Sequence, residues 1–358
     1  MKIRSRLKDY EVIFEKKLDF IERLIKNPLA QFVVDSNIYG LYRHYLQGIP
    51  DDRLVMIEAT EQNKVVETAL SICKQMTNIP AKRNAVLISI GGGIIQDITG
   101  FAANILYRGI KWVFVPTTLL AQCDSCIGGK TSLNYDKYKN LLGTFYPPDV
   151  IHICPEFVNT LTQADFESGM GEVIKFNIMG GADGLEHISS HMELLMKRDA
   201  VAIEESIRYS LEFKRSFIEE DEFDRGERIK LNFAHTFGHA IETVTEYQIP
   251  HGTAVAIGMI MANCISVKRG ILSDIIAGRS EELLLQVIHV DFSDMDKPFD
   301  EFVRAMRKDK KQIDSSLTAV LMTDVPKELK IVHDVSVEEV KYAFDYFKYL
   351  YQKAKRKS

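Results

Sequence analysis

Short apolar runs alternate with longer amphipathic stretches over the first 160 residues of the chain. The apolar runs are rich in β-branched residues and predict six strands: Tyr10–Phe14, Gln31–Asp35, Arg53–Glu58, Ala85–Ile90, Trp112–Val115 and Val150–Cys154. The stretches between them predict helices at Lys17–Lys26, Ile38–Leu46 and Lys64–Met76, with a further helix that ends at Ile105. Strands that alternate with helices favour a parallel, doubly wound sheet that binds ligands at the carboxyl ends of its strands.

Beyond about residue 160 the pattern becomes helical. The periodicity predicts helices at Met192–Met196, Ala200–Glu220, Arg228–Thr245, Val255–Lys268, Ser280–Ile288 and Val337–Lys353, and a lone strand at Leu317–Met322. The sequence therefore predicts an α/β domain over residues 1–160 and an all-α domain over residues 161–358.

Composition and charge narrow the function classes. The formal net charge of -5 argues against a protein that binds nucleic acid or membranes through bulk charge, so any anion site must be local. No signal peptide is expected, and the apolar stretch Ala254–Val267 is too short to span a bilayer, which predicts a buried helix. Five cysteines do not form a disulfide framework. Cys123 and Cys126 form a single CxxC, a spacing found in redox pairs and half zinc sites, but without a second CxxC we interpret them as reduced thiols in a cytoplasmic protein.

Two features in the first hundred residues are typical of a nucleotide-binding site. Gly91-Gly92-Gly93 follows a predicted strand and opens a helix, where a backbone without Cβ atoms can approach a pyrophosphate; a plain tight turn is the alternative. Asp35 and Asn37 follow another strand, where they can bind a ribose or cap the next helix, and Glu61 and Lys64 allow the same two interpretations.

Residues Pro116–Pro148 form a polar, glycine-rich segment that is too long for a simple connection. Its apolar residues and its paired glycines predict that it is ordered. Lys130, Lys139 and Asn140 are donors suited to phosphate or carboxylate, although for any one of them alone a solvated side chain is the preferred interpretation.

The stretch Arg228–Gly252 concentrates metal-ligating side chains. His235 and His239 are spaced i and i+4, which places them on one helical face, and His251 follows a break at Pro250 where the chain can fold back. Converging imidazoles beside cations suggest a metal next to an anionic ligand, and the alternative is an amphipathic helix with solvated or core histidines. Farther upstream, Glu172 and Lys175 lie three residues apart on one face.

Taken together, these motifs resemble the dehydroquinate synthase family, and more widely the sugar-phosphate cyclases. The matching segments are GGGIIQDITGF (Gly91–Phe101), Arg108–Asn134, KNLLGTFYPP (Lys139–Pro148), GMGEVIK (Gly169–Lys175), LNFAHTFGHAIE (Leu231–Glu242) and HGTAVAIGM (His251–Met259), with a weaker match at Asp309–Lys311.

The resemblance implies an NAD-binding α/β domain, a helical metal-binding domain, an active site in the cleft between them and a homodimer. It assigns a divalent metal, Zn²⁺ or Co²⁺, to Glu172, His235 and His251. It assigns NAD to Asp35, Asn37, Glu61, Lys64, Gly92, Gly93, Asp97, Thr117, Thr118, Lys130, Lys139 and Thr160. It assigns the sugar phosphate to Asp124, Lys130, Lys139, Asn140, Lys175, Lys214, Arg228, Asn232 and His239, with Arg108 from a second subunit and either Lys310 or Lys311 on the phosphate.

The implied reaction converts 3-deoxy-arabino-heptulosonate 7-phosphate to dehydroquinate, a step of the shikimate pathway. NAD transiently oxidises a ring hydroxyl, phosphate leaves by elimination, the hydride returns, and an intramolecular aldol step closes the carbocycle. Gln96 and Ala234 stand where the family usually has glycine, and Asn104-Ile105 and Tyr135-Asp136 are also unusual. These departures concern the geometry of the cofactor loop and the details of substrate binding.

Three alternatives remain open from the sequence. A sugar-phosphate cyclase for sedoheptulose 7-phosphate, in secondary metabolism or a polysaccharide pathway, would not need cations for a substrate carboxylate. A metal-dependent NAD polyol dehydrogenase would release NADH and would not need the anion-binding set. A catalytically inactive scaffold or sensor would not need every metal and cation position to be filled, as they are here.

Overall fold

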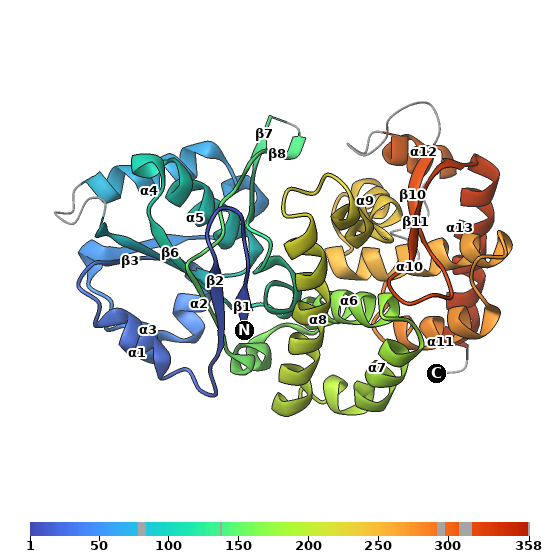
Figure 1. Ribbon diagram of the computed structural model, residues 1–358, viewed down its shortest axis with the longest axis horizontal. Coiled ribbons are helices and arrows are strands. Elements are labelled where there is room, and N and C mark those ends of the chain that lie inside the picture. The colour runs from blue at the N-terminus through green and yellow to red at the C-terminus, as the bar shows by residue number, and fades with distance from the viewer. Residues whose placement is uncertain (78–83, 137, 292–297, 308–316, 357–358) are drawn as a thin grey trace. The chain divides into compact units, whose positions relative to one another are not determined.

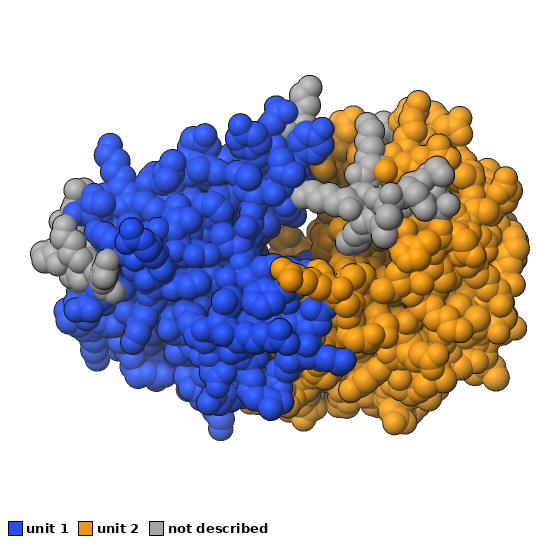
Figure 2. Space-filling model, turned by 45° about the horizontal axis from the view of Figure 1, so that its top comes forward, with its two compact units in different colours: residues 1–161, 218–223 blue, residues 162–217, 224–358 orange. Residues whose placement is uncertain are grey.

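The computed structural model describes residues 1–77, 84–136, 138–291, 298–307 and 317–356. The chain divides into two compact units, coloured separately in Figure 2. Unit 1 comprises Met1–Leu161 and Ile218–Phe223, and unit 2 comprises Thr162–Phe217 and Asp224–Ser358. The division after Leu161 lies one residue from the boundary expected from the sequence. The short return of residues 218–223 to unit 1 was not expected, and it is held there by Glu219 and Glu222, whose carboxylates accept hydrogen bonds from Arg4 and Ser5.

A seven-stranded sheet forms the centre of unit 1. Its order is β1 (Lys2–Ile3), β2 (Tyr10–Phe14), β9 (Val150–Ile153), β6 (Lys111–Pro116), β5 (Val86–Gly91), β3 (Ala30–Asp35) and β4 (Leu54–Ile57). All neighbours pair in parallel except β1 and β2. The six predicted strands are therefore present, and their carboxyl ends meet along one edge of the sheet.

Helices cover both faces of this sheet (Figure 1). On one face, α1 (Phe20–Ile25), α2 (Ser36–Leu41) and α3 (Arg43–Leu46) pack their apolar side chains against β3 and β5. On the other face lie α4 (Val66–Thr77) and α5 (Gly93–Ile105). α5 packs against the sheet, and α4 packs against α5. The predicted doubly wound arrangement is confirmed. The predicted helix Ile38–Leu46 is wrong in one respect, because Tyr42 leaves helical geometry (φ −112°, ψ 29°) and separates α2 from α3.

The segment Pro116–Pro148 is ordered, as predicted, but it contains secondary structure that the sequence did not reveal. A short π-helical turn, Ala121–Ser125, precedes a hairpin of β7 (Lys130–Tyr135) and β8 (Tyr138–Phe145). Lysine, asparagine and glycine are poor strand formers, so the pattern did not predict these strands. The hairpin rises from unit 1 in Figure 1.

Unit 2 is built mainly of helices around α10 (His251–Lys268). The other helices are α6 (Gln163–Met179), α7 (Gly181–Met196), α8 (Ala200–Glu220), α9 (His235–Val244), α11 (Asp274–Leu284), α12 (Phe299–Arg307) and α13 (Val337–Lys355). Every residue from Gly252 to Ser266 in α10 is buried, which confirms the predicted buried helix. Among the described residues, no helix combines the length and the apolar character needed to cross a membrane.

Two sequence predictions for unit 2 need correction. The strand β10 (Leu317–Met322) is not alone, because it pairs with β11 (Leu329–Val335), so unit 2 is helical but not entirely α. β11 was missed because its partly exposed residues do not alternate regularly. The predicted helix Arg228–Thr245 is broken: a 3₁₀ segment, Glu227–Asn232, ends before Ala234, whose left-handed conformation (φ 68°) redirects the chain into α9.

Candidate active site

Glu172, His235 and His251 converge inside unit 2. Glu172 lies in α6, while His235 and His251 are the first residues of α9 and α10. Oε1 of Glu172 lies 3.7 Å from Nε2 of His235 and 3.5 Å from Nε2 of His251. Two ligands at tetrahedral angles, each about 2.1 Å from a zinc ion, lie about 3.4 Å apart. The three atoms therefore have the spacing of a zinc ligand set.

Two glycines allow these ligands to come together. Gly171 precedes Glu172 and Gly252 follows His251, and a Cβ atom on Gly171 would overlap the carbonyl oxygen of Gly252. A Cβ atom on Gly252 would overlap the carbonyl oxygen of Ser168. The N–H of Gly252 also donates to Oγ of Ser168 at 2.9 Å. The backbones of α6 and α10 thus touch where each helix carries a ligand.

Hydrogen bonds select the Nε2 atoms of both histidines as the metal-facing atoms. Nδ1 of His235 lies 3.0 Å from the carbonyl oxygen of Phe233, and a carbonyl oxygen only accepts, so this nitrogen carries the proton. Nδ1 of His251 lies 3.0 Å from Oε2 of Glu242. A second group, His239, Glu242 and His251, also has metal-ligand spacing, but Glu242 already binds the far nitrogen of His251. The geometry therefore favours the Glu172 group.

The electrostatics of the group fit a cation. Both carboxylate oxygens of Glu172 are fully buried, and neither accepts a hydrogen bond of normal geometry among the described residues; Nζ of Lys175 forms a close ion pair with Oε2. Desolvation opposes the charged form of the His251 ring, but Glu242 and Glu172 outweigh it and raise the pKa of His251 to about 10. A carboxylate and two imidazoles that leave further coordination positions open are typical of a catalytic divalent metal site.

Three of the cations that the sequence predicts as substrate ligands are buried in unit 2. Lys175 is 2% exposed, Arg228 3% and Lys214 8%. The ammonium of Lys175 lies 4.4 Å from the ring centre of Phe176, and that ring contacts Phe213 beside Lys214 in α8. Burying ammonium and guanidinium groups is costly unless anions compensate them. Lys175 is compensated by its ion pair with Glu172, so these cations lie in the same unit as the metal ligands and one of them contacts a ligand directly.

His239 lies beside the ligand set, and Asn232 precedes it in the chain. The ring of His239 lies 5.4 Å from that of His235 and 5.9 Å from that of His251, measured between ring centres. Asn232 ends the 3₁₀ segment before α9, and its Nδ2 donates to the carbonyl oxygen of Ile229.

In unit 1, the glycine triplet joins β5 directly to α5, as predicted. Gly92 is the N-cap of α5, and a Cβ atom on it would lie 3.1 Å from Cγ2 of Thr118. The N–H of Thr117 donates to the carbonyl oxygen of Gly91 at 3.0 Å, so Thr117 lies next to the turn that starts α5. Free N–H groups at a helix N-terminus favour an anion such as a dinucleotide phosphate.

The residues expected near the ribose have structural partners. Asp35 caps α2 by accepting from the N–H of Asn37 at 3.0 Å, which confirms the capping interpretation, and burial raises the pKa of its carboxyl group. The hydroxyl of Thr160 lies 2.7 Å from that of Tyr42. Binding of NAD by these residues stays a prediction.

Lys64 and Asp97 form a buried ion pair that organises the β7–β8 hairpin. Nζ of Lys64 lies 2.6 Å from Oδ2 of Asp97 and 2.6 Å from Oδ1 of Asn140. Oγ of Ser132 lies 2.9 Å from Asp97 and 3.3 Å from Lys64. Burial raises the pKa of Asp97, although Lys64 and Ser132 oppose the shift. The structure thus brings three predicted site residues together around Ser132.

Ser132 and Asn134 also belong to this group, although the sequence did not predict them as site residues. Asn134 donates to Oε2 of Glu61 at 2.7 Å, and Glu61 also pairs with Lys139 at 3.2 Å. Residues two apart along a strand lie on the same face, so residues 130, 132 and 134 of β7 share one face. The predicted site residue Lys130 would therefore have indicated Ser132 and Asn134, had the sequence predicted a strand here.

Two more predicted residues, Asp124 and Arg108, are placed by local structure. Asp124 lies in the π-helical turn, whose Ser125 exchanges two hydrogen bonds of 2.7 Å with the buried side chain of Gln96. Arg108 ends the short segment Leu106–Arg108 in a left-handed conformation (φ 66°). Lys310 and Lys311 lie outside the described residues.

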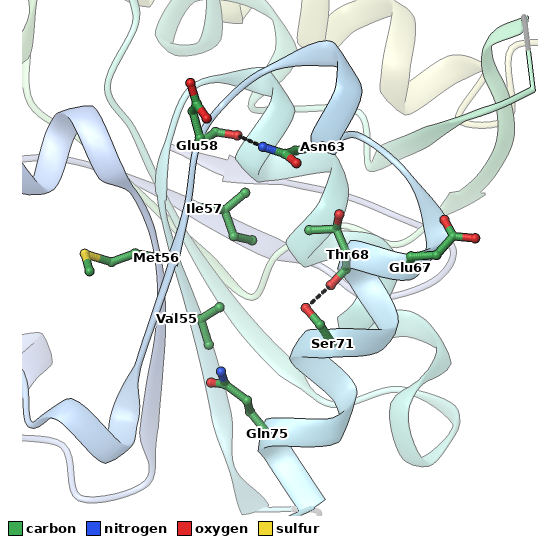
Figure 3. Close-up of a pocket in the computed structure, with 9 residues that line it drawn as sticks. All are labelled: Val55, Met56, Ile57, Glu58, Asn63, Glu67, Thr68, Ser71 and Gln75. Carbon is green, nitrogen blue, oxygen red and sulfur yellow. Dashed lines mark hydrogen bonds between the residues drawn. The ribbon is translucent and has the colours of Figure 1, made fainter.

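A hollow of about 460 Å³ lies elsewhere in unit 1, beside the edge strand β4 and helix α4 (Figure 3). Its lining is Val55, Met56, Ile57, Glu58, Asn63, Glu67, Thr68, Ser71 and Gln75, which includes none of the predicted site residues. Asn63 and Ser71 use their donors on the carbonyl oxygens of Glu58 and Thr68. This hollow lacks the converging cations of an anion site.

Comparison with known proteins decides the family. Residues 54–168 match the model of the 3-dehydroquinate synthase N-terminal domain, and residues 169–312 match that of the C-terminal domain. The chain belongs to the 3-dehydroquinate synthase family. It is 32% identical over 346 residues to the 3-dehydroquinate synthase of Dictyoglomus thermophilum, covering 94% of this chain and 96% of that one. It is 36% identical over 323 residues to that of Syntrophotalea carbinolica, covering 89% and 87%.

Solved structures of other enzymes have a fold similar to that of this chain. A 2-epi-5-epi-valiolone synthase from Streptomyces hygroscopicus, solved with NAD⁺ and Zn²⁺ bound, is 25% identical with a TM-score of 0.81 and covers 96% of this chain and 99% of that one. A glycerol dehydrogenase from Schizosaccharomyces pombe shares the fold at 12% identity and a TM-score of 0.65, covering 97% and 91%. The fold alone therefore does not separate a cyclase from the dehydrogenase alternative.

Proposed function

We propose that this chain is a 3-dehydroquinate synthase, which cyclises 3-deoxy-arabino-heptulosonate 7-phosphate with loss of phosphate. The observation that carries the proposal is the zinc-spaced group of Glu172, His235 and His251 in a unit that also buries three cations. The family match and the relatives named 3-dehydroquinate synthase support the substrate. A polyol dehydrogenase has no need of buried cations that match phosphate and carboxylate.

The proposed cofactors are NAD and a divalent metal, zinc or cobalt. A metal at this group supplies a Lewis acid for a substrate hydroxyl, and NAD supplies a reversible hydride acceptor. Glu172 and the two Nε2 atoms would hold the metal. The N–H groups at the start of α5, with Gly92, Gly93, Thr117 and Thr118, would hold the dinucleotide phosphates.

The chain's own residues would bind and orient the substrate. Lys175, Lys214 and Arg228, with Asn232 and His239, would bind its anionic and polar groups from unit 2. From unit 1, Asp124, Lys130, Lys139 and Asn140 would add polar contacts. Such fixed charges lower the barrier by positioning the substrate and by stabilising charge that develops in the transition state.

The test is a side-by-side assay of the purified chain with zinc and substoichiometric NAD. We expect phosphate release and a cyclic product from 3-deoxy-arabino-heptulosonate 7-phosphate without net accumulation of NADH. Better turnover of sedoheptulose 7-phosphate would overturn the substrate assignment in favour of another cyclase. NADH produced in proportion to product would favour the dehydrogenase alternative.

We also propose a homodimer in which Arg108 of one subunit reaches the phosphate site of the other. The support is the resemblance together with the position of Arg108 in the short segment that follows α5. Mixing Arg108→Ala and Lys175→Ala chains should restore roughly a quarter of the sites if the two chains pair at random. No recovery in verified heterodimers would contradict shared sites. A cytoplasmic location stays a prediction from the thiol state of the cysteines.

A further inference from the structure

Asn134 is held at the junction of three predicted site residues. Its Nδ2 donates to Oε2 of Glu61 at 2.7 Å and to the carbonyl oxygen of Glu61 at 3.1 Å. Its Oδ1 accepts from the N–H of Asn140 at 2.9 Å, and its own N–H donates to the carbonyl oxygen of Lys64 at 2.8 Å. One side chain thus connects the segment that holds Glu61 and Lys64 to the strand that holds Asn140.

The local strand geometry explains how Asn134 can make these bonds. The register of β7 and β8 shifts between Leu133 and Tyr135, and the extra residues of this irregularity lie on β8 between Tyr138 and Leu142, where Asn140 is found. A bulge disrupts the ladder locally and leaves residues without regular partners. Asn134 lies opposite this bulge and forms an isolated bridge with Val65.

Asn140 depends on this contact. Its backbone is left-handed (φ 52°), a conformation that costs a residue with a Cβ atom about 1 kcal/mol. The hydrogen bond from its N–H to Asn134 offsets part of that cost. In this conformation, its Oδ1 lies within hydrogen-bonding distance of Lys64 and Ser132.

We propose that Asn134 is a positioning residue that couples the cofactor site to the substrate site of unit 1. It orients the Glu61 carboxylate toward the dinucleotide and fixes Asn140 for the sugar phosphate, so that ordering one site favours the other. This inference rests on the proposed function, which assigns Glu61 to NAD and Asn140 to the substrate. Asn134 itself touches neither ligand in this assignment.

The test variants change the hydrogen-bonding groups of Asn134 and Glu61. Asn134→Asp keeps the acceptor for the Asn140 N–H but replaces the donor to Glu61 with a second carboxylate. Asn134→Ala removes the side-chain bonds without adding charge, which covers the case in which the aspartate variant folds poorly. Glu61→Gln with Asn134→Asp reverses the polarity of the pair, because the glutamine can donate to the new carboxylate. Asn27→Asp is the matched control, since Asn27 is not a predicted site residue and, among the described residues, its side chain accepts one hydrogen bond, from the N–H of Leu29.

Two readouts are needed: the NAD dissociation constant by calorimetry, and kcat and KM for 3-deoxy-arabino-heptulosonate 7-phosphate. We expect Asn134→Asp to weaken NAD binding by about tenfold and to raise the substrate KM more than it lowers kcat. The same substitution should cost much less in the Glu61→Gln background, and Asn27→Asp should change neither readout.

The outcomes separate this inference from the proposed function. Unchanged NAD binding and KM in both Asn134 variants, or an equal loss in the presence and absence of Glu61→Gln, would overturn the coupling role alone. A wild-type chain that does not bind NAD would overturn the proposed function, and this inference with it.

Discussion

Nδ1 of His251 lies 3.0 Å from the carboxylate of Glu242, on the side of the ring opposite the Nε2 atom that faces Glu172. The two residues are nine positions apart, with Glu242 in α9 and His251 at the start of α10. A carboxylate behind a histidine ligand fixes the ring orientation and makes the metal-facing nitrogen more basic.

Removing this carboxylate should weaken metal binding without removing a ligand. We expect Glu242→Ala to lower zinc affinity by about 10- to 100-fold, measured by competition with a chromophoric chelator. Glu242→Gln retains an acceptor for Nδ1 and should lose less. Equal zinc affinity in the wild type and both variants would contradict an orienting role for Glu242.

The contact of α6 with α10 should be equally sensitive. Gly252→Ala places a methyl group against the carbonyl oxygen of Ser168, so the two backbones must separate next to Glu172 and His251. We expect a loss of unfolding free energy of about 1–3 kcal/mol together with loss of bound zinc. Gly278→Ala is the control, because no atom lies within 4 Å of a Cβ at that glycine. Retention of zinc by Gly252→Ala would show that the helices can separate without disturbing the site.

Gln96 should stabilise the turn that carries Asp124. Its side chain donates to the carbonyl oxygen of Ser125 and accepts from the Ser125 hydroxyl, both at 2.7 Å. Gln96→Leu leaves both Ser125 groups without these bonds, and we expect it to cost about 1–3 kcal/mol of unfolding free energy and to raise the substrate KM. Thr99→Val on the same helix is the control, since the buried Thr99 hydroxyl has no hydrogen-bond partner to lose among the described residues. A Gln96→Leu variant as stable as Thr99→Val would contradict this role.

The sequence was sufficient for features that depend on local pattern. The period of the apolar residues located the six sheet strands and the buried helix α10, although α10 begins at His251 and not at the predicted Val255. The strand–glycine–helix turn at Gly91 followed from the same local reasoning.

Features that depend on distant parts of the chain did not follow from the pattern. Lys64 and Asp97 form an ion pair across 33 positions, and only the folded sheet brings them together around Ser132. The left-handed Ala234 interrupts a periodicity that reads as one continuous helix, because an alanine carries no signal for φ above zero. The β7–β8 hairpin is stabilised by its side-chain contacts with α5 and Glu61 rather than by the strand propensity of its own residues.

Arg269 and Glu339 provide a test of stability that is independent of the active site. Arg269 ends α10, and its Nε and Nη2 donate to the two carboxylate oxygens of Glu339 at 2.7 and 2.8 Å, while Glu339 also closes the capping box of α13 with Ser336. The hydrogen bond from Arg269 lowers the pKa of Glu339, although partial burial opposes the shift.

A carboxyl group whose pKa is lower in the folded state stabilises the fold above its unfolded pKa of about 4.3 and loses that contribution as the pH falls through the folded value. Arg269→Met should therefore cost about 1 kcal/mol near pH 7, and the difference from the wild type should shrink below about pH 4. Urea unfolding at both pH values measures this. Arg279→Met is the control, because the Arg279–Glu186 pair is more exposed and should contribute less. A cost for Arg269→Met that stays constant down to pH 3 would mean that the arginine acts through packing and through its bond to the Asp334 carbonyl oxygen, and not through the charge of Glu339.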